Sequence, residues 1–410
     1  MAIRNFLLPP GTLPDARVLL GARALRAFGD GFVSLLLPYY LTLLGYGAWE
    51  IGLLVTATLT GSGLMTLGVG LIAHRHSARH LLLLASVLMA ATGLAVPAFT
   101  DFWPLFVIAV VGTLNPAAND VTLFSPLEQT LLTRAAPATS RTALFGRYSL
   151  IGALVAAIGA QAAGIPDFYA PNGGAGLLPA LQAMFLLYAL LGAASFMLYL
   201  RLSPALESGR HEQPVPLGKS RRIVYTLAGL FSIDAFAGGF AVQSLLALWL
   251  FQKFDLSVTA AGTIFFWTGL LTAFSHLAAA KVAARFGLIN TMVYTHLPAN
   301  LFLILVPFMP TLELALLFLF LRSALSSMDV PARSSYVMAV VSPGERPAAA
   351  SVTAVPRSLA SALSPSLAGA LLAMSTFGWP LVICGALKIV YDLALLKMFS
   401  AVKPPEESGR

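Results

Sequence analysis

Long apolar stretches alternate with short polar ones along almost the whole chain. A membrane-spanning helix needs about 20 mostly apolar residues, and twelve stretches of that kind can be placed in the sequence. Several exceed the minimum length, which predicts helices that tilt or project beyond the bilayer. The pattern predicts an all-α membrane protein with twelve transmembrane helices, at 17–45, 49–73, 81–99, 102–132, 142–165, 178–201, 223–251, 258–285, 289–308, 311–341, 347–373 and 377–400.

The composition supports this prediction and removes several classes of protein. Of the 410 residues, 58% are hydrophobic and 10% are charged, whereas an ordinary soluble domain has roughly 25% charged residues. Mean hydropathy is +0.83. The single cysteine, Cys384, excludes a disulfide framework and a thiolate metal cage. The sequence also lacks HExxH, GxxxxGK[ST], GxGxxG and GxSxG motifs, so we expect no enzyme, no cofactor and no metal.

The distribution of charge predicts the topology. The formal net charge is +8, but Lys and Arg lie in short loops rather than in one patch for nucleic acid. They gather in both tails and in alternate loops, at 74–80, 133–141, 202–222, 281–288 and 342–346. The opposite loops contain only Lys253, so by the positive-inside rule the basic loops and both termini are cytoplasmic. We expect a multi-pass monomer in the inner (plasma) membrane, in contact with the lipid bilayer and with no nucleic acid.

The two halves of the chain look like copies of one another. Asp30 in the first predicted span matches Asp234 in the seventh, and Asp120 in the fourth matches Asp329 in the tenth. Matches in the same order and at similar offsets along so apolar a chain indicate an internal repeat. A linker rich in Pro and Gly separates the copies. The predicted order is a cytoplasmic tail, a six-helix bundle, the linker, a second six-helix bundle and a cytoplasmic tail, at 1–16, 17–201, 202–222, 223–400 and 401–410.

Six plus six helices, a basic central loop and repeated halves resemble the major facilitator superfamily over residues 17–400. That family has the pattern GxxxD[RK]xGxx[RK] between its second and third spans. Here the segment runs from Gly70 through Arg75 to Arg79, with His74 in place of the acid. The resemblance implies two pseudo-symmetric six-helix bundles and a cytoplasmic gating loop formed by Gly70, Arg75, Arg79, Arg285 and Gly287.

Four acidic residues in the predicted spans are candidates for proton coupling. An ionisable side chain in hydrocarbon costs free energy and tends to face a cavity or a partner. In the family that the chain resembles, spans 1, 4, 7 and 10 line the central cavity, which implies that acids in these spans converge. Arg26 lies one helical turn before the first of them, on the same helix face. The candidates are Asp30, Asp120, Asp234 and Asp329.

A second set of residues is predicted to bind the solute. Arginine keeps its proton in proteins and grips carboxylate or phosphate with a planar fork, so arginines within the spans predict an anion-binding clamp. Aromatic side chains beside the acids predict the wall of a pocket. The substrate-binding candidates are Arg26, Phe32, Asn119, Phe236, Arg322 and Arg357.

Spacing also predicts static pairs that neutralise charge within the membrane. Oppositely charged residues four positions apart lie on one helix face and favour a pair. We expect His296 to serve helix packing rather than metal binding. The predicted ion pairs are Arg333 with Asp329, Lys388 with Asp392, and Glu128 with a loop arginine such as Arg134.

Together these features predict a secondary transporter that moves a small organic solute by alternating access, with protons as the coupling ion. We favour proton-coupled efflux of drug-like or metabolite compounds. One alternative is an organic-anion transporter or exchanger that uses the buried arginines. An alternative of another class is a non-transporting membrane receptor or scaffold that has kept a transporter fold.

Overall fold

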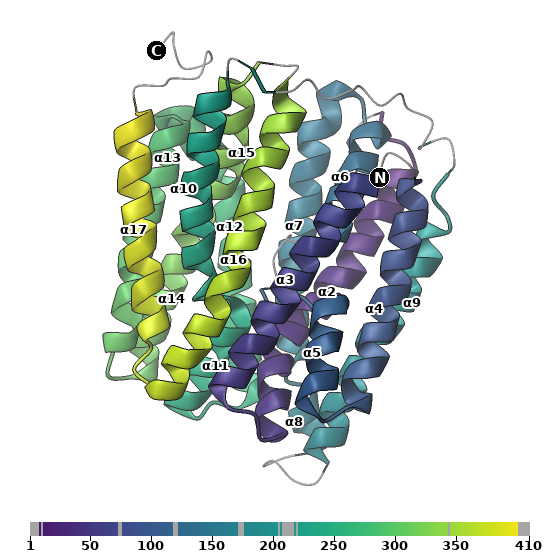
Figure 1. The fold of residues 1–410 in the computed structure, drawn as a ribbon, viewed down its shortest axis with the longest axis vertical. Coiled ribbons are helices and arrows are strands. Elements are labelled where there is room, and N and C mark those ends of the chain that lie inside the picture. Colours follow the sequence, from purple (N-terminus) through teal and green to yellow (C-terminus); the bar gives the residue numbers. More distant parts are fainter. Residues whose placement is uncertain are drawn as a thin grey trace. The chain divides into compact units, whose positions relative to one another are not determined.

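The computed structural model describes residues 8–9, 11–72, 76–117, 122–170, 176–203, 206, 217–218, 220–342 and 345–400. Regular structure in these ranges is helical throughout, which confirms the predicted fold class (Figure 1). The helices are α2 (Asp15–Leu43), α3 (Ala48–Ile72), α4 (Ala78–Ala98), α5 (Phe102–Val111), α6 (Phe124–Ala135), α7 (Ala138–Ala162), α8 (Ile165–Tyr169), α9 (Leu177–Tyr199), α10 (Arg221–Gly239), α11 (Gln243–Phe254), α12 (Val258–Phe286), α13 (Leu288–Leu305), η3 (Val306–Phe308), α14 (Leu312–Leu325), α15 (Asp329–Val340), α16 (Arg346–Met374) and α17 (Trp379–Phe399).

Helices occupy each of the twelve predicted stretches. Within the described residues, eight helical stretches are long and apolar enough to cross a membrane. α2 and α17 are not among the eight, although they have 29 and 21 residues. α2 carries several charged side chains along its length, and charge lowers the hydropathy of a segment. The eight stretches are Ala48–Val69, Ala78–Ala98, Ala143–Tyr169, Leu177–Tyr199, Arg221–Phe254, Val258–Phe286, Leu288–Phe308 and Leu312–Val340.

Three of the predicted spans consist of two helices each. The fourth is divided into α5 and α6, the seventh into α10 and α11, and the tenth into α14 and α15. Pro116 follows α5 and Pro331 lies in the first turn of α15, where a missing N–H breaks no helical hydrogen bond. Broken helices at membrane depth leave backbone groups that need other partners, and transporters use such breaks to line a site.

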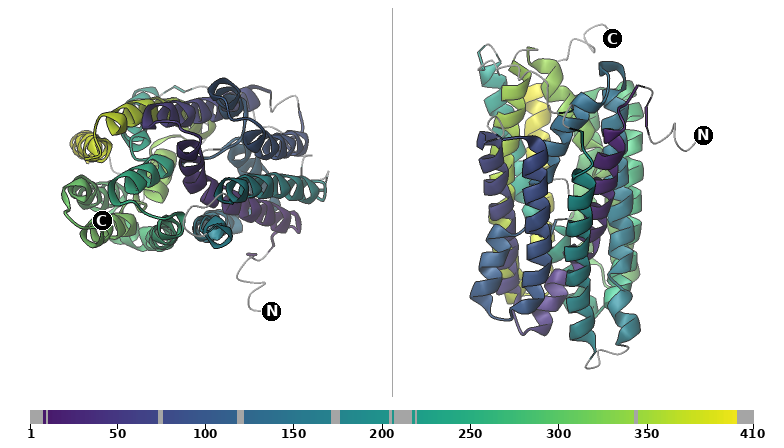
Figure 2. Two further views of the ribbon diagram at one scale, coloured as in Figure 1. Left: turned by 90° about the horizontal axis from the view of Figure 1, so that it is seen from below. Right: turned by 90° about the vertical axis from the view of Figure 1, so that its right-hand side faces the viewer.

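The chain forms two compact units whose helices pack in a repeated pattern. In unit 1, α2 packs against α7 and α9, and α4 packs against α9. In unit 2, α10 packs against α16 and α17, and α13 packs against α17. Figure 2 shows further views of these helices. Unit 1 comprises Met1–Tyr46, Ala57–His211 and Leu256–Phe266, and unit 2 comprises Gly47–Thr56, Glu212–Asp255 and Trp267–Arg410.

Small residues let the central helices of unit 1 approach closely. A Cβ atom at Gly31 of α2 would overlap the carbonyl oxygen of Ala156 in α7, and one at Gly159 of α7 would overlap the carbonyl oxygen of Phe28. Because lipid is as apolar as a leucine side chain, helices in a membrane associate through close packing rather than through the hydrophobic effect. The glycines therefore allow the contact that holds α2 beside α7.

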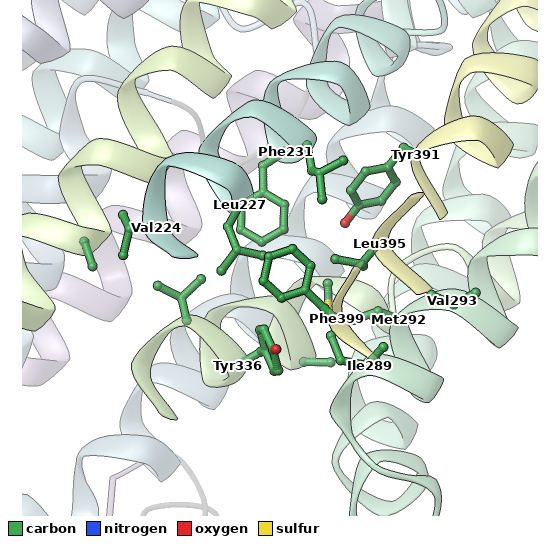
Figure 3. Close-up of a cluster of buried hydrophobic side chains, with 14 of the residues drawn as sticks. Val224, Leu227, Phe231, Ile289, Met292, Val293, Tyr336, Tyr391, Leu395 and Phe399 are labelled. Atoms are coloured by element: carbon green, nitrogen blue, oxygen red, sulfur yellow. The ribbon is translucent and has the colours of Figure 1, made fainter. Parts of the chain in front are cut away.

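The packed core of unit 2 lies where α10, α13, α15 and α17 meet (Figure 3). Phe231 and Tyr391 belong to this core and also contact charged groups. The guanidinium carbon of Arg333 lies 5.4 Å from the ring centroid of Phe231, and the rings of His296 and Tyr391 are 6.2 Å apart. The labelled members of the core are Val224, Leu227, Phe231, Ile289, Met292, Val293, Tyr336, Tyr391, Leu395 and Phe399.

In each unit, one arginine caps the C-terminal end of the preceding helix. Nε of Arg141 donates to the carbonyl oxygen of Thr133 at 2.9 Å, and Nε of Arg346 donates to that of Met338 at 3.0 Å. Both bonds join residues eight positions apart and satisfy carbonyls at the C-terminal ends of α6 and α15. Equivalent contacts at equivalent places support the internal repeat.

Candidate functional site: two buried charge clusters

The first cluster surrounds Glu128 of α6 in unit 1. This side chain is fully buried and accepts hydrogen bonds from Nη2 of Arg26, from the hydroxyl of Tyr148 at 2.6 Å and from that of Tyr199 at 2.6 Å. The predicted pair with Arg134 is wrong, because the guanidinium of Arg26 reaches Glu128 from α2. We call Arg26, Glu128, Tyr148 and Tyr199 the Glu128 cluster.

Asp30 lies one turn beyond Arg26 on α2. Its carboxylate accepts a hydrogen bond from Nδ2 of Asn115 at 3.1 Å, and Asn115 belongs to the break between α5 and α6. Arg26 stacks over the ring of Phe124 at 4.1 Å while it binds Glu128. The acid that Arg26 grips is therefore Glu128, although the spacing of four had favoured a pair with Asp30.

The second cluster surrounds Asp234 of α10 in unit 2. Its carboxylate accepts from Nη1 of Arg333 at 2.9 Å and from Nζ of Lys388. Nη2 of Arg333 lies 3.2 Å from Asp329, which confirms the predicted pair four residues apart. The predicted pair of Lys388 with Asp392 is wrong, because Lys388 points from α17 to α10. We call Asp234, Asp329, Arg333 and Lys388 the Asp234 cluster.

Asp392 instead joins α17 to α13. Its two oxygens lie 2.9 Å from Nδ1 of His296 and 2.9 Å from Nδ2 of Asn300. The side chain of Asp392 is fully buried and that of His296 is 4% exposed. His296 therefore does more than pack, because it binds a buried carboxylate.

Two further arginines adjoin the Asp234 cluster. Arg357 of α16 interacts electrostatically with Arg333, Asp234 and Asp329. Arg322, in the last turn of α14, interacts with Cys384, and Cys384 interacts in turn with Lys388 and Asp234. Nε of Arg322 is buried and has no hydrogen-bond partner among the described residues. Unit 2 thus contains a guanidinium group with an unused donor that is linked electrostatically to the Asp234 cluster through Cys384.

The aromatic candidates occupy different surroundings. Phe32 is fully buried against Phe28, with ring centroids 5.6 Å apart. Phe236 is half-buried one turn before Phe240, whose ring lies edge-on at 5.5 Å. Phe236 lies two residues after Asp234 on α10. Of the two aromatic candidates, it is therefore the one that shares a helix with a member of the Asp234 cluster.

The predicted gating residues are described in part. Arg79 of α4 donates to the carbonyl oxygens of Tyr199 at 3.3 Å and Leu200 at 2.7 Å. Gly287 has a φ of +87°, a conformation that favours glycine, at the start of α13. Gly70 lies in α3 and Arg285 is exposed near the end of α12. The candidates Arg75, Asn119 and Asp120 lie outside the described residues.

Some members of each cluster were predicted from the sequence. Sequence reasoning proposed Asp234 and Asp329, which share Arg333, but it did not propose Tyr148 and Tyr199 as partners of a carboxylate. A usable signal existed for Asn300, which lies four residues after His296 and on the same helix face. Within the described ranges, no group of three or more His, Cys, Asp or Glu side chains is placed to hold a metal ion.

Comparisons with known proteins agree with this architecture. The family model of the Major Facilitator Superfamily matches residues 19–321 and 229–410. The Saccharomyces cerevisiae protein "Uncharacterized membrane protein YJR124C" is 25% identical over 95% of this chain and 94% of its own length. Among solved structures, the nucleoside transporter NupG matches with a TM-score of 0.72 at 15% identity, covering 94% of this chain and 99% of NupG. The human organic anion transporter MFSD10 (TETRAN) matches with a TM-score of 0.65 at 16% identity, covering 93% and 100%. At these identities the solved structures show the fold alone.

Proposed function

The chain belongs to the major facilitator superfamily of membrane transporters, and on that premise we propose that it is a secondary transporter whose solute is a small organic anion. The family makes it a multi-pass integral membrane protein that handles small-molecule solutes. The class of solute is our proposal, and the buried, unpartnered Nε of Arg322 carries it. We propose that the solute crosses by alternating access.

The balance of charge in unit 2 favours an anion. In the Asp234 cluster, Asp234 and Asp329 offset Arg333 and Lys388. Arg322 and Arg357 add positive charge beside it, and no ion pair to either is seen among the described residues. A buried charge without an opposite partner is strongly unfavourable. An anionic solute supplies that partner, and a guanidinium binds a carboxylate or phosphate with two parallel hydrogen bonds.

Charged residues of both signs lie close to the helix breaks of unit 2. Arg322 lies in the last turn of α14, Asp329 begins α15, and Asp234 lies in the second-last turn of α10 before the break to α11. In transporters, interrupted helices place backbone groups and charged side chains beside the solute near the middle of the membrane. The breaks therefore support a solute site that is built around Arg322 in unit 2.

Proton-coupled efflux of drug-like compounds receives less support from these contacts. Efflux driven by Asp234 requires a carboxylate that readily takes up a proton. Two cations hold Asp234 in its charged form, and a positive neighbour opposes protonation of an acid. The roles of Asp30, Asp120 and Asp329 in proton coupling stay predictions, as do the gating loop and the direction of transport.

Topology and location also stay proposals. We propose an inner-membrane monomer with both termini in the cytoplasm, because the basic loops alternate with loops that contain only Lys253. A cysteine placed at either end and labelled with a membrane-impermeant reagent in intact cells tests this proposal. Labelling without lysis would contradict it.

The proposed solute class is tested with acids and their neutral amides. Purified protein is titrated with benzoate and benzamide, with nicotinate and nicotinamide, and with succinate and succinamide, and binding is followed by calorimetry. We expect at least one acid to bind while its amide does not, and the bound acid to be transported into proteoliposomes. A charged hydrogen bond contributes about 1.5–3 kcal/mol, so Arg322→Gln should weaken binding about tenfold or more.

Arg322→Lys is the matched control, because it keeps the charge and loses only the planar fork. It should retain more affinity than Arg322→Gln. Equal binding of acids and amides would contradict an anionic solute. Binding of the acid without flux in any gradient would favour the non-transporting receptor over the transporter.

A further inference from the structure

A buried imidazole–carboxylate pair lies within electrostatic range of the Asp234 cluster. His296 of α13 and Asp392 of α17 are joined at 2.9 Å, and Asn300 holds the second oxygen of the same carboxylate at 2.9 Å. The His296 side chain is 4% exposed and the Asp392 side chain is fully buried. The proposed anion binding uses none of these three residues, so their role is unassigned.

The surroundings connect this pair to the anion site through charge. On α17, Lys388 lies one turn before Asp392 and acts on it electrostatically. Asp234 of α10 is within electrostatic range of His296, of Lys388 and of Arg357 on α16. From α15, Arg333 and Asp329 act on Tyr391, whose ring lies edge-on to His296. The charge on His296 therefore acts on Asp234, which in turn acts on Arg357 of the proposed anion site.

We infer that the His296–Asp392 pair is a proton-binding site whose occupation strengthens binding of the anion. This inference rests on the proposed function. When His296 takes up a proton, the pair changes from a net charge of −1 to 0, and the positive excess beside the anion rises by one. Asp392 stabilises the imidazolium that forms, because it is an opposite charge at hydrogen-bond distance. The anion and one proton then bind together.

Thermodynamic linkage makes the effect reciprocal. If a proton on His296 strengthens binding of the anion by some factor, the bound anion strengthens binding of the proton by the same factor. Coupling between two sites typically changes affinity about 5–150-fold. Imidazole side chains as a class change charge between about pH 5 and pH 8, and a carboxylic acid such as benzoate is ionised over most of that range, so the two pH values of the test bracket it.

The test measures binding of benzoate to the full-length protein at about pH 5.5 and at about pH 8. We expect the wild type to bind benzoate about fivefold or more tightly at the lower pH. His296→Gln keeps a polar side chain that does not titrate, so its affinity should be the same at both values. Asp392→Asn removes the charge that stabilises the imidazolium and should also remove the difference. His80→Gln, at an exposed histidine of α4, is the matched control and should keep the wild-type response.

Three results separate this inference from the function on which it rests. Loss of the pH response in His296→Gln with benzoate still bound supports both. A pH response that His296→Gln keeps unchanged overturns the proton site and leaves anion binding intact. Failure of every acid to bind at either pH overturns the anionic solute itself. Circular dichroism and elution from a sizing column show whether each variant is folded.

Discussion

The Glu128 cluster and the Asp234 cluster are both buried, yet they differ in how completely their charges are satisfied. Glu128 accepts hydrogen bonds from one arginine and two tyrosines. Nε and Nη1 of Arg26 are also buried without a hydrogen-bond partner among the described residues, but Glu128 balances the charge of this guanidinium. The Asp234 cluster is also paired within itself, but Arg322 and Arg357 add positive charge that the two acids of the cluster do not balance.

The difference shows how two copies of one packing pattern can take separate roles. α2 and α10 hold equivalent places against their neighbours, and each has a buried acid, Asp30 in α2 and Asp234 in α10. Asp30 accepts from the amide of Asn115, whereas Asp234 accepts from two cations. A satisfied cluster holds helices together, while an excess of charge is unfavourable until a ligand arrives. We therefore propose a structural role for the Glu128 cluster and a binding role for the residues around Arg322.

The largest effect is expected when Arg26 is replaced. Arg26→Met leaves the fully buried Glu128 without its cation, and breaking a buried pair from one side costs about 3–5 kcal/mol. The free energy of unfolding, measured by denaturant titration in detergent, should fall by that amount. Arg134→Met is the control, because Arg134 binds the carbonyl oxygen of Leu206 at 3.4 Å and not Glu128. Equal losses in both variants would contradict a structural role for the Glu128 cluster.

Replacing Arg322 should have the opposite sign. Arg322→Met removes a buried charge that has no acid of its own, and apolar replacement of buried charge can stabilise a protein by about 1–4 kcal/mol. The melting temperature of the ligand-free protein should rise, while affinity for benzoate is lost. If stability falls as it does in Arg26→Met, then Arg322 is already paired and the proposed difference between the clusters is wrong.

A smaller effect is expected at the tyrosines of the Glu128 cluster. Tyr199→Phe and Tyr148→Phe each remove one hydroxyl that donates to Glu128 at 2.6 Å. A single hydrogen bond contributes about 1 kcal/mol, so each variant should lose about that much stability and keep its affinity for benzoate. A loss of benzoate binding in either variant would connect the Glu128 cluster to the solute after all.

The smallest effect is expected at Glu345, in the loop before α16. Hydrogen bonds from the hydroxyl of Ser342, the backbone N–H of Gly218 and the hydroxyl of Ser220 lower the pKa of Glu345 from 4.5 to about 2. Because the pKa is lower in the folded protein, the stabilisation is present above pH 4.5 and is lost as the pH falls toward about 2. Glu345→Gln should therefore melt below the wild type near pH 7, and the two should converge in acid. A constant difference at every pH would show that the charge of Glu345 is not the cause.

The long apolar stretches were enough to predict the helical class, because lipid imposes about 20 apolar residues on each span, and the matched acids of the two halves predicted the repeat. Pro116 and Pro331 were the only sequence signals for the helix breaks in the fourth and tenth spans. Ion pairs within one helix follow from spacing, as Arg333 and Asp329 show. Pairs between helices, such as Arg26 with Glu128 or Lys388 with Asp234, depend on how the helices rotate and pack. Spacing along the chain contains no information about that rotation.

The central proposal is that an anionic solute balances the positive charge around Arg322. Cys384 is buried within electrostatic range of Arg322, so Cys384→Asp places a permanent carboxylate where the solute's acid group is proposed to act, and Cys384→Ser is the neutral control. The deciding measurement is the rise in melting temperature that benzoate causes in each variant. We predict that Cys384→Asp melts higher than the wild type without ligand and no longer responds to benzoate, while Cys384→Ser still responds. A Cys384→Asp protein that binds benzoate as the wild type does would contradict the claim.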